Sequence, residues 1–214
     1  MRNIYKMRVK KATVGIVGVE GQVDGQGVLV PGPFILTATH CIKWSGTGEM
    51  ALGDYFIETI RTIDGKQLRL QVLFADLVSD MAVLGAPDCQ EFYRDCEAFE
   101  KWSEVTKCVP LMTRTLRYNS ALPVEILSHE GDWINGNVHR YGMEMLGTMC
   151  LEANQQIRGG TSGGPVVDLD GRLLGVVSNF HEGLDDNGKC IGMLPIAHLT
   201  LPAWVLRRGR TVGA

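Results

Sequence analysis

Two adjacent hydroxyl residues, Thr161 and Ser162, lie in a stretch that contains four glycines, RGGTSGGP at residues 158–165. Because glycine has no Cβ atom, a serine in this setting can project into a cleft while neighbouring backbone N–H groups turn toward one point. An acyl-transfer nucleophile with an oxyanion hole needs both features. A glycine-rich surface turn or an anion-binding nest has the same composition, so this stretch alone leaves those alternatives open.

A serine hydroxyl is a poor nucleophile unless a base takes its proton, so the first interpretation requires a histidine with a carboxylate behind it. His40 is the candidate base, because it closely follows FILTA, an apolar and β-forming run at residues 34–38. The other histidines lie in polar or loop-like sequence and are interpreted as surface or structural residues: His129, His139, His181 and His198.

Asp80 is the candidate carboxylate, because it immediately precedes the apolar run MAVL at residues 81–84. A carboxylate in that position would be partly buried and would need a partner, which a histidine N–H can provide. A strand-start cap or a surface aspartate are the alternatives. Asp54, Asp64 and Asp76 are rivals for the same role, although an Asp-Gly turn explains Asp64 better.

Short β-strands are predicted to position these residues. The chain has 26 glycines and only 7% aromatic residues, and runs such as VGIVGV and LLGVVS favour strands over long amphipathic helices. A hairpin at residues 27–38, with Pro-Gly-Pro at its turn, would deliver His40 at its far end. Asp-Gly pairs at residues 64–65 and 170–171 indicate two further hairpins. Other strands are predicted within residues 12–30, 55–62, 67–75, 82–84, 109–112, 124–127, 141–151 and 164–179.

A charged, helix-compatible segment at residues 88–107 is interpreted as the connection between two lobes. We therefore predict an N-terminal lobe, residues 1–100, that carries His40 and Asp80, and a C-terminal lobe, residues 101–214, that carries Ser162. The sequence TLPAWVLRR near the end has a threonine cap, an early proline and terminal arginines, which indicates a short closing helix.

The bulk composition disfavours several classes of partner. The formal net charge is −3 and the isoelectric point is about 6.0, so the chain lacks the basic surplus of a nucleic-acid or membrane-surface protein. The first residues contain no apolar stretch suited to a signal peptide or a membrane span, and a cytoplasmic location is predicted. The six cysteines are expected to be mostly free thiols. Their spacing indicates no metal site, and no cofactor is predicted.

Three segments resemble the signature segments of chymotrypsin- and trypsin-like serine proteases: TATHC at residues 37–41, DMAVL at 80–84 and GTSGGP at 160–165. They come in that family's order, His then Asp then Ser, at spacings of 80 − 40 = 40 and 162 − 80 = 82 residues. The similarity covers about residues 12–206, and the short loops resemble compact bacterial members. The resemblance implies two six-stranded antiparallel β-barrels with a short C-terminal helix.

The same resemblance implies roles for individual residues. Ser162 would be the nucleophile, His40 the general base and Asp80 the carboxylate that orients the base. The N–H groups of Gly160 and Ser162 would form the oxyanion hole. Ser178 matches the family serine that donates a hydrogen bond to the catalytic aspartate.

Substrate preference is less determined. Ser178, Asn179 and Phe180 are expected to line the substrate cleft. Trypsin carries its pocket aspartate six residues before the nucleophile, and counting back here, 162 − 6 = 156, reaches the uncharged Gln156. A cationic side chain before the scissile bond is therefore disfavoured, and a modest apolar or neutral polar one is preferred. An acidic side chain, paired with His181 or Arg158, is the alternative.

Two departures from the secreted members of the family bear on activation. Thr161 stands where trypsin-like zymogens have the aspartate that pairs with a freshly cut N-terminus, so activation by trimming is not expected. Cys41 is the first cysteine in the chain, so the disulfide that many relatives make to an upstream cysteine cannot form.

The function predicted from these observations is a serine endopeptidase acting on a protein or peptide substrate, in selective intracellular processing. Two alternatives stay open. One is a catalytically silent relative that serves as a binding module. The other is a latent enzyme whose oxyanion loop is ordered by an activating protein partner.

Overall fold

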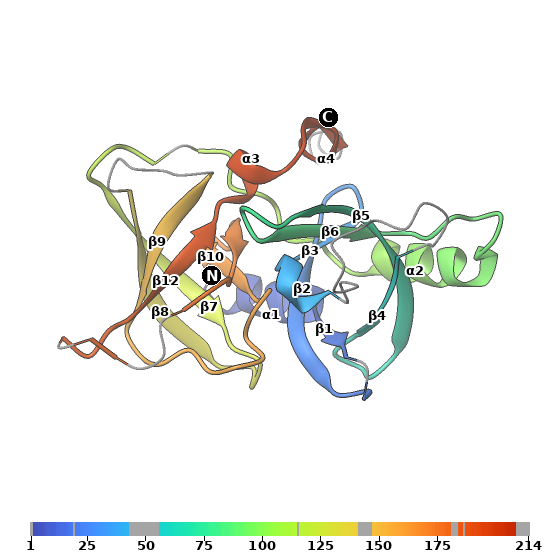
Figure 1. Cartoon of the computed structure of the whole chain (residues 1–214), viewed down its shortest axis with the longest axis horizontal. Helices are drawn as coiled ribbons and strands as arrows, with labels where there is room; N and C mark the ends of the chain where they lie inside the picture. Colours follow the sequence, from blue (N-terminus) through green and yellow to red (C-terminus); the bar gives the residue numbers. More distant parts are fainter. Residues whose placement is uncertain are drawn as a thin grey trace.

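The computed structural model describes residues 2–18, 20–42, 56–114, 116–140, 147–180, 184–185 and 187–208. Two lobes built of short antiparallel strands lie side by side in it (Figure 1). The first six strands make one lobe and the next six make the other. This arrangement confirms the predicted all-β fold of two six-stranded lobes.

The first lobe is a closed barrel. Its strands are β1 (Thr13–Val17), β2 (Val23–Val30), β3 (Phe34–Thr37), β4 (Ile57–Arg61), β5 (Gln67–Asp76) and β6 (Met81–Gly85). They close in the order β1-β2-β3-β6-β5-β4. Every residue of β3 and β6 is buried, as expected for continuous apolar runs that are covered on both faces. The paired strands β3 and β6 carry the predicted base and carboxylate at their ends.

The second lobe is a six-stranded antiparallel sheet in the order β11-β10-β7-β8-β9-β12. Its strands are β7 (Ala121–Leu127), β8 (Trp133–His139), β9 (Thr148–Ala153), β10 (Pro165–Asp168), β11 (Leu173–Val176) and β12 (Cys190–Pro195). The two edges of the sheet approach each other, because Gly175 of β11 forms an isolated bridge with Ile196, which directly follows β12.

Local turn chemistry places most of the predicted strands. Both Asp-Gly hairpins form, between β4 and β5 and between β10 and β11. The predicted strand at residues 109–112 is wrong, because only Leu111 pairs there, in a single bridge to Leu173. Tyr55 and residues 141–146, at the starts of two predicted strands, lie outside the described residues.

Four helices complete the described chain: α1 (Arg2–Ala12), α2 (Tyr93–Val105), α3 (Ala197–Thr200) and α4 (Ala203–Arg208). The closing helix is confirmed as α4. The predicted connecting segment contains α2, so the proposed boundary at residue 100 falls inside a helix that packs on β5. None of the helices that the structure describes has the length and apolar character needed to cross a lipid bilayer.

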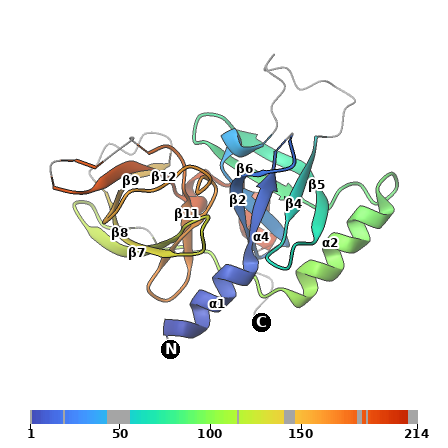
Figure 2. The same ribbon diagram turned by 90° about the horizontal axis from the view of Figure 1, so that it is seen from below.

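Helix α1 was not predicted, and it ties the two lobes together. The helix leads into β1 of the first barrel and lies at the junction of the lobes in Figure 2. The Tyr5 hydroxyl donates a hydrogen bond to Glu125 of β7, and Lys6 Nζ lies 2.7 Å from the other carboxylate oxygen. Glu125 is only 7% exposed, so these two contacts satisfy a carboxylate that burial would otherwise destabilise.

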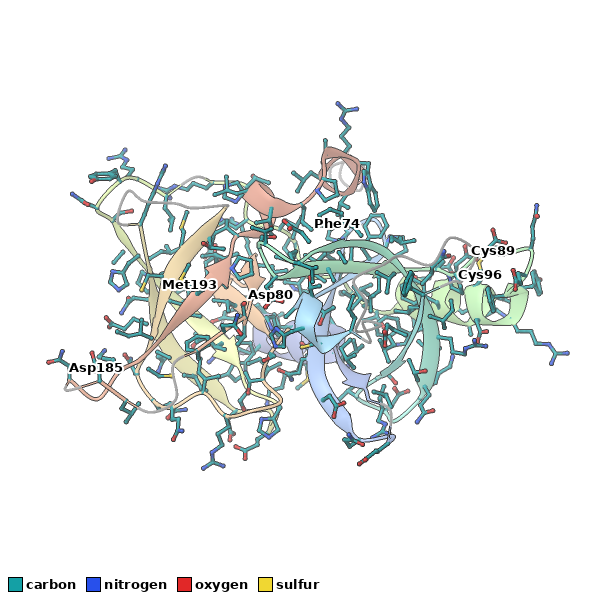
Figure 3. All side chains as sticks on the ribbon, in the orientation of Figure 1. Phe74, Asp80, Cys89, Cys96, Asp185 and Met193 are labelled. Carbon is teal, nitrogen blue, oxygen red and sulfur yellow. A yellow bond between two sulfur atoms is a disulfide. The ribbon has the colours of Figure 1, made fainter. Side chains whose placement is uncertain are left out.

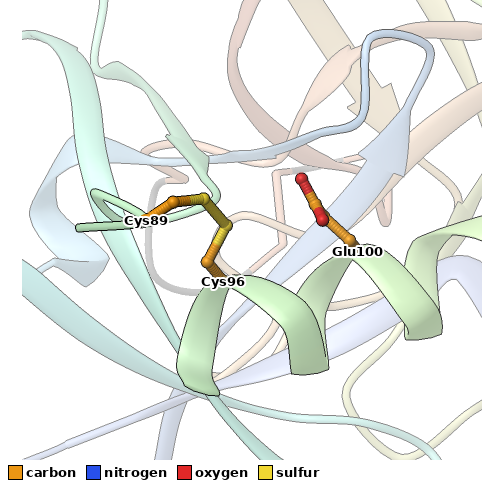
Figure 4. A group of neighbouring side chains, drawn as sticks. All are labelled: Cys89, Cys96 and Glu100. Atoms are coloured by element: carbon orange, nitrogen blue, oxygen red, sulfur yellow. A yellow bond between two sulfur atoms is a disulfide. The ribbon is translucent and has the colours of Figure 1, made fainter. Parts of the chain in front are cut away.

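The cysteines are mostly free thiols, as expected: Cys41, Cys108, Cys150 and Cys190. Cys89 and Cys96 differ, because a turn and the start of α2 bring their Cα atoms to 5.5 Å and the sulfurs are bonded (Figure 3). Glu100 lies one helical turn further on (Figure 4). Among the described residues this is the one group of three potential metal-ligand side chains that lie close together, and its two sulfurs are bonded to each other.

Candidate active site

The pairing of β3 with β6 brings His40 and Asp80 together. The register Thr37↔Ala82 places the residues that leave β3 beside those that enter β6. His40 lies in a 3₁₀ turn, Thr39–Cys41, directly after β3, and Asp80 is the last residue before β6. The backbone N–H of Thr39 donates to the Asp80 carbonyl at 3.2 Å, which fixes the two segments side by side. Figure 3 shows Asp80 at the junction of the two lobes.

The Asp80 carboxylate accepts three hydrogen bonds. Its Oδ1 accepts the backbone N–H of His40 at 3.0 Å. Its Oδ2 lies 2.7 Å from His40 Nδ1 and 2.5 Å from the Ser178 hydroxyl, which is donated from the second lobe. An ionised carboxylate can only accept, so the proton between the two side chains belongs to Nδ1, and in the neutral ring Nε2 is the basic nitrogen. This arrangement fixes the orientation of the His40 ring.

These contacts shift both pKa values in the directions expected for an ion pair. The hydrogen bond with Asp80 is the largest cause that raises the pKa of His40, followed by a hydrogen bond with Cys41, and the pKa reaches about 10. Burial by itself would raise the pKa of Asp80, but the hydrogen bonds from His40 and Ser178 outweigh it and hold the pKa below its usual range. Near neutral pH the resting pair is therefore imidazolium and carboxylate.

The raised pKa of His40 predicts a titration that NMR can follow. Since folding favours the protonated ring, the stability that the pair contributes is complete below pH 6.5 and is lost as the pH rises through about 10. We expect the His40 ring protons, assigned with His40→Gln, to titrate far above pH 6.5. In Asp80→Asn the midpoint should fall by several units, because the largest cause is removed. A wild-type midpoint at or below 6.5 would contradict this assignment.

The backbone of Ser162 is held by the first barrel. Its carbonyl accepts the N–H of Gln26 in β2 at 2.7 Å, and the next residue, Gly163, donates its N–H to the Val177 carbonyl at 2.7 Å. Gly163 has φ +76, and a Cβ atom there would lie 1.9 Å from the Gln26 carbonyl oxygen, so only glycine fits. Sequence reasoning missed Gln26, because nothing local to β2 indicates that its N–H meets a loop of the other lobe.

The turn before the nucleophile also requires glycine. The N–H of Thr161 donates to the Arg158 carbonyl at 3.3 Å, which closes a four-residue turn. Gly160 occupies the third position with φ +84, as a type II turn demands. This turn leads directly into Ser162. The two N–H groups expected to form the oxyanion hole therefore belong to the turn, at Gly160, and to Ser162 itself.

The predicted substrate-binding residues lie with Ser162 around one cavity of about 430 Å³. They are Gln156, Ser178, Asn179 and Phe180, and the other lining residues are Ile157, Arg158, Gly159 and Val177. Phe180 is held by a bridge to Gly192 of β12. No carboxylate is among the described residues that line this cavity. The lining therefore agrees with the expectation, drawn from the uncharged Gln156, that a cationic substrate side chain is disfavoured.

Gly25 in β2 lies beside both Cys41, the residue after His40, and the backbone of Ser162. A Cβ atom on Gly25 would lie 2.5 Å from the Cys41 sulfur and 3.2 Å from the Ser162 carbonyl oxygen, so glycine leaves room for both neighbours. Ser178 links the two halves further, because it lines the Ser162 cavity and bonds Asp80. Between the described side chains of Ser162 and His40 the structure shows no direct hydrogen bond.

The rival carboxylates have structural roles. Asp76 accepts hydrogen bonds from the Val78 N–H and the Ser79 hydroxyl within the turn before β6. Asp64 accepts the hydroxyl of Thr62 in its hairpin turn. Asp54 lies outside the described residues.

Comparisons with known proteins agree with this geometry. A family model described as a trypsin-like peptidase domain matches residues 23–176. The serine endoprotease from Yersinia pestis is similar in structure, with a TM-score of 0.62 and 18% identity over 99% of this chain and 67% of that chain. The active form of the Rv3671c protease from M. tuberculosis has a TM-score of 0.59 and 17% identity over 99% of this chain and 85% of that chain.

The inactive form of the same mycobacterial protease matches almost equally, with a TM-score of 0.58 and 17% identity over 99% of this chain and 94% of that chain. No curated protein sequence matches significantly. At these identities the structural likeness concerns the fold.

Proposed function

Since the chain belongs to the trypsin-like peptidase family and is a serine endopeptidase, we propose that Ser162, His40 and Asp80 form its catalytic triad. The observation that carries the proposal is the Asp80 carboxylate, which receives both the His40 ring at 2.7 Å and the Ser178 hydroxyl from the other lobe. A turn or strand cap would need neither contact. Because Nδ1 donates to Asp80, Nε2 is the nitrogen that accepts a proton when the His40 ring is neutral.

The proposed reaction proceeds through an acyl-enzyme. Ser162 Oγ bonds to the carbonyl carbon of the scissile peptide as its proton passes to His40 Nε2. The carbon–nitrogen bond then breaks, and the same proton goes to the departing amine. A water molecule then attacks the acyl carbon as one of its protons passes to His40 Nε2. The bond to Ser162 Oγ breaks, the proton returns to Oγ, and the carboxylic acid product leaves. Backbone N–H groups of Gly160 and Ser162 receive the negative oxygen, and each such donor supplies about 3 kcal/mol in comparable sites.

Substrate binding supplies the missing contact between nucleophile and base. Catalytic hydrogen bonds are often absent or long in a free enzyme and tighten in the substrate complex. The imidazolium form of His40 also has no lone pair for the serine proton, and it must lose a proton before it can act as a base. Activity is therefore proposed to increase with pH through the neutral range.

The proposed substrate is a protein or peptide with a modest apolar or neutral polar side chain before the scissile bond. The cavity beside Ser162 supports this preference, because Gln156 and Asn179 are uncharged and Arg158 is its one charged lining residue among those described. An acidic site that would hold lysine or arginine is not formed by these residues. The wider proposal is selective processing in the cytoplasm; the four free thiols support this location and the Cys89–Cys96 disulfide counts against it.

A latent enzyme is the second reading, in which an activating protein partner orders the site. The observation that favours it is the absence of a hydrogen bond between the described side chains of Ser162 and His40. The structural likeness extends to both an active and an inactive form of one protease, so it favours neither state.

Labelling with a fluorophosphonate tests the proposal. Intact mass and peptide mapping should show a single adduct on Ser162 that is lost in Ser162→Ala and in His40→Ala. Labelling that occurs only after a candidate partner protein is added would support the latent reading. An adduct on another residue, or none under either condition, would overturn the proposed triad.

A further inference from the structure

A turn of the second lobe contacts the loop that precedes the nucleophile. His129 lies between β7 and β8, and its side chain is about one-third exposed. Its Nδ1 lies 3.3 Å from the hydroxyl of Thr161, and its backbone N–H donates to the same oxygen at 3.4 Å. Thr161 is fully buried, directly before Ser162. The two residues are 32 positions apart, so the tertiary fold creates this contact.

The Thr161 oxygen accepts the backbone N–H of His129, and its single hydroxyl proton is available for the ring nitrogen. In the ring tautomer that carries its proton on Nε2, Nδ1 accepts this hydroxyl proton. A buried hydroxyl without this partner would lose a hydrogen bond that water cannot replace. Thr161 is thus held by the turn that carries His129.

The ring of His129 lies beside Gly160. A Cβ atom on Gly160 would lie 3.4 Å from the Cγ atom of the ring, which is an ordinary van der Waals distance. A Cβ atom on Gly159 would have no heavy atom within 4 Å other than those of its own residue and its two chain neighbours. A pair of adjacent glycines is the most flexible backbone that a loop can have, and here the ring of His129 lies against one of its sides.

A second contact joins the same two segments at the surface. Arg158 NH1 lies 2.7 Å from Glu130 Oε1, with the arginine side chain 68% exposed and the glutamate 44%. Such exposed ion pairs contribute little, because water and salt screen them. Of the two contacts, only that between Thr161 and His129 involves a fully buried side chain.

We propose that His129 is a positioning residue that holds residues 158–162 in the conformation in which the N–H groups of Gly160 and Ser162 converge. The inference rests on the proposed function, since that function assigns the oxyanion hole to these groups. His129 acts through Thr161 and touches no reacting atom. Its loss should weaken binding of the transition state more than binding of the substrate.

Three substitutions at one position separate this role from a general structural one. The side-chain oxygen in His129→Asn lies close to where Nδ1 was, so this variant keeps the acceptor for Thr161. His129→Gln places its oxygen nearer to the position of Nε2, and His129→Phe keeps the ring shape without an acceptor. Glu130→Gln serves as the control for the exposed ion pair.

The measurements are the fluorophosphonate labelling rate of Ser162, kcat and KM on a peptide substrate found by library profiling, and the melting temperature. We expect the labelling rate and kcat to fall by about 10- to 100-fold in His129→Phe. This is less than the roughly 100- to 1000-fold loss of kcat that follows removal of a whole oxyanion-hole donor. KM should stay within about threefold. His129→Asn should recover most of the loss, His129→Gln less, and Glu130→Gln should resemble the wild type.

The outcomes distinguish this inference from the triad itself. A wild-type protein that never labels at Ser162, with or without partners, would overturn both. A wild type that labels while His129→Phe labels equally fast would overturn only the role of His129. The role of His129 would also be overturned if the loss of activity in the three variants paralleled the fall in their melting temperatures. An equal loss of activity in His129→Asn and His129→Phe would overturn it too.

Discussion

Ser162→Ala is expected to lower kcat by roughly 10⁶-fold while leaving the fold intact. The nucleophile contributes its hydroxyl to chemistry, whereas the contacts that hold it in place use its backbone: the carbonyl accepts the Gln26 N–H, and Gly163 and Gly164 continue the turn. Alanine keeps all of these backbone contacts. The melting temperature should therefore change little, which separates a loss of catalysis from a loss of structure.

The double variant Ser162→Ala/His40→Ala sharpens this prediction. If the base serves only to take the serine proton, its removal adds little once the serine is absent, so the two losses should not multiply. The measurement is kcat of both single variants and the double variant on one peptide substrate, with Ser103→Ala in α2 as control. Residual activity above about 1% in Ser162→Ala would assign the nucleophile elsewhere, and multiplicative losses would mean that His40 acts independently of Ser162.

Asp80→Asn is expected to lower kcat by roughly 10⁴-fold, the second largest effect. Asp80 has φ +56, a backbone conformation that asparagine tolerates well, so the substitution should not strain the chain. The amide can offer only one acceptor oxygen. If that oxygen keeps the His40 backbone N–H, an NH₂ group faces His40 Nδ1, and the ring proton moves to Nε2, where it blocks attack by Ser162.

Steady-state kinetics and the fluorophosphonate labelling rate measure the effect of Asp80→Asn. Asp64→Asn is the matched control, because Asp64 is another loop aspartate of the first lobe, and its hydrogen bonds serve its own hairpin turn. Its activity should equal that of the wild type. A loss of less than tenfold in Asp80→Asn, with the protein folded, would show that another group orients His40.

Much of the fold followed from local signals. The apolar runs that became β3 and β6 and the Asp-Gly turns at residues 64–65 and 170–171 lie in the structure as predicted. Helix α1 did not follow, because its buried residues Tyr5 and Val9 gain their stability from packing on other segments. The strand predicted at residues 109–112 is reduced to a single bridge between Leu111 and Leu173, because the backbone N–H groups of Val109 and Met112 donate to two different strands, at Leu29 of β2 and Leu173 of β11.

The candidate site divides in the same way. Ser162, His40 and Asp80 were identified from residue type, order and nearby sequence, and the structure joins His40 to Asp80 directly. The contacts of Gln26 with Ser162 and of His129 with Thr161 were not predicted. Neither residue has an unusual sequence context, so only their neighbours in space reveal what they contact.

The sequence by itself determined the β-rich class and the tight turns, because each depends on residues a few positions apart and on backbone conformations that only certain side chains permit. It also supplied the candidate triad that we propose, Ser162, His40 and Asp80. The tertiary structure alone decided that the N–H of Gln26 holds Ser162, that Thr161 meets His129 and that Tyr5 meets Glu125. These contacts arise from the register of two six-stranded lobes and from how the lobes pack. Hydrogen bonds act only over about 3 Å, so small changes in strand register would remove them while leaving every local signal unchanged.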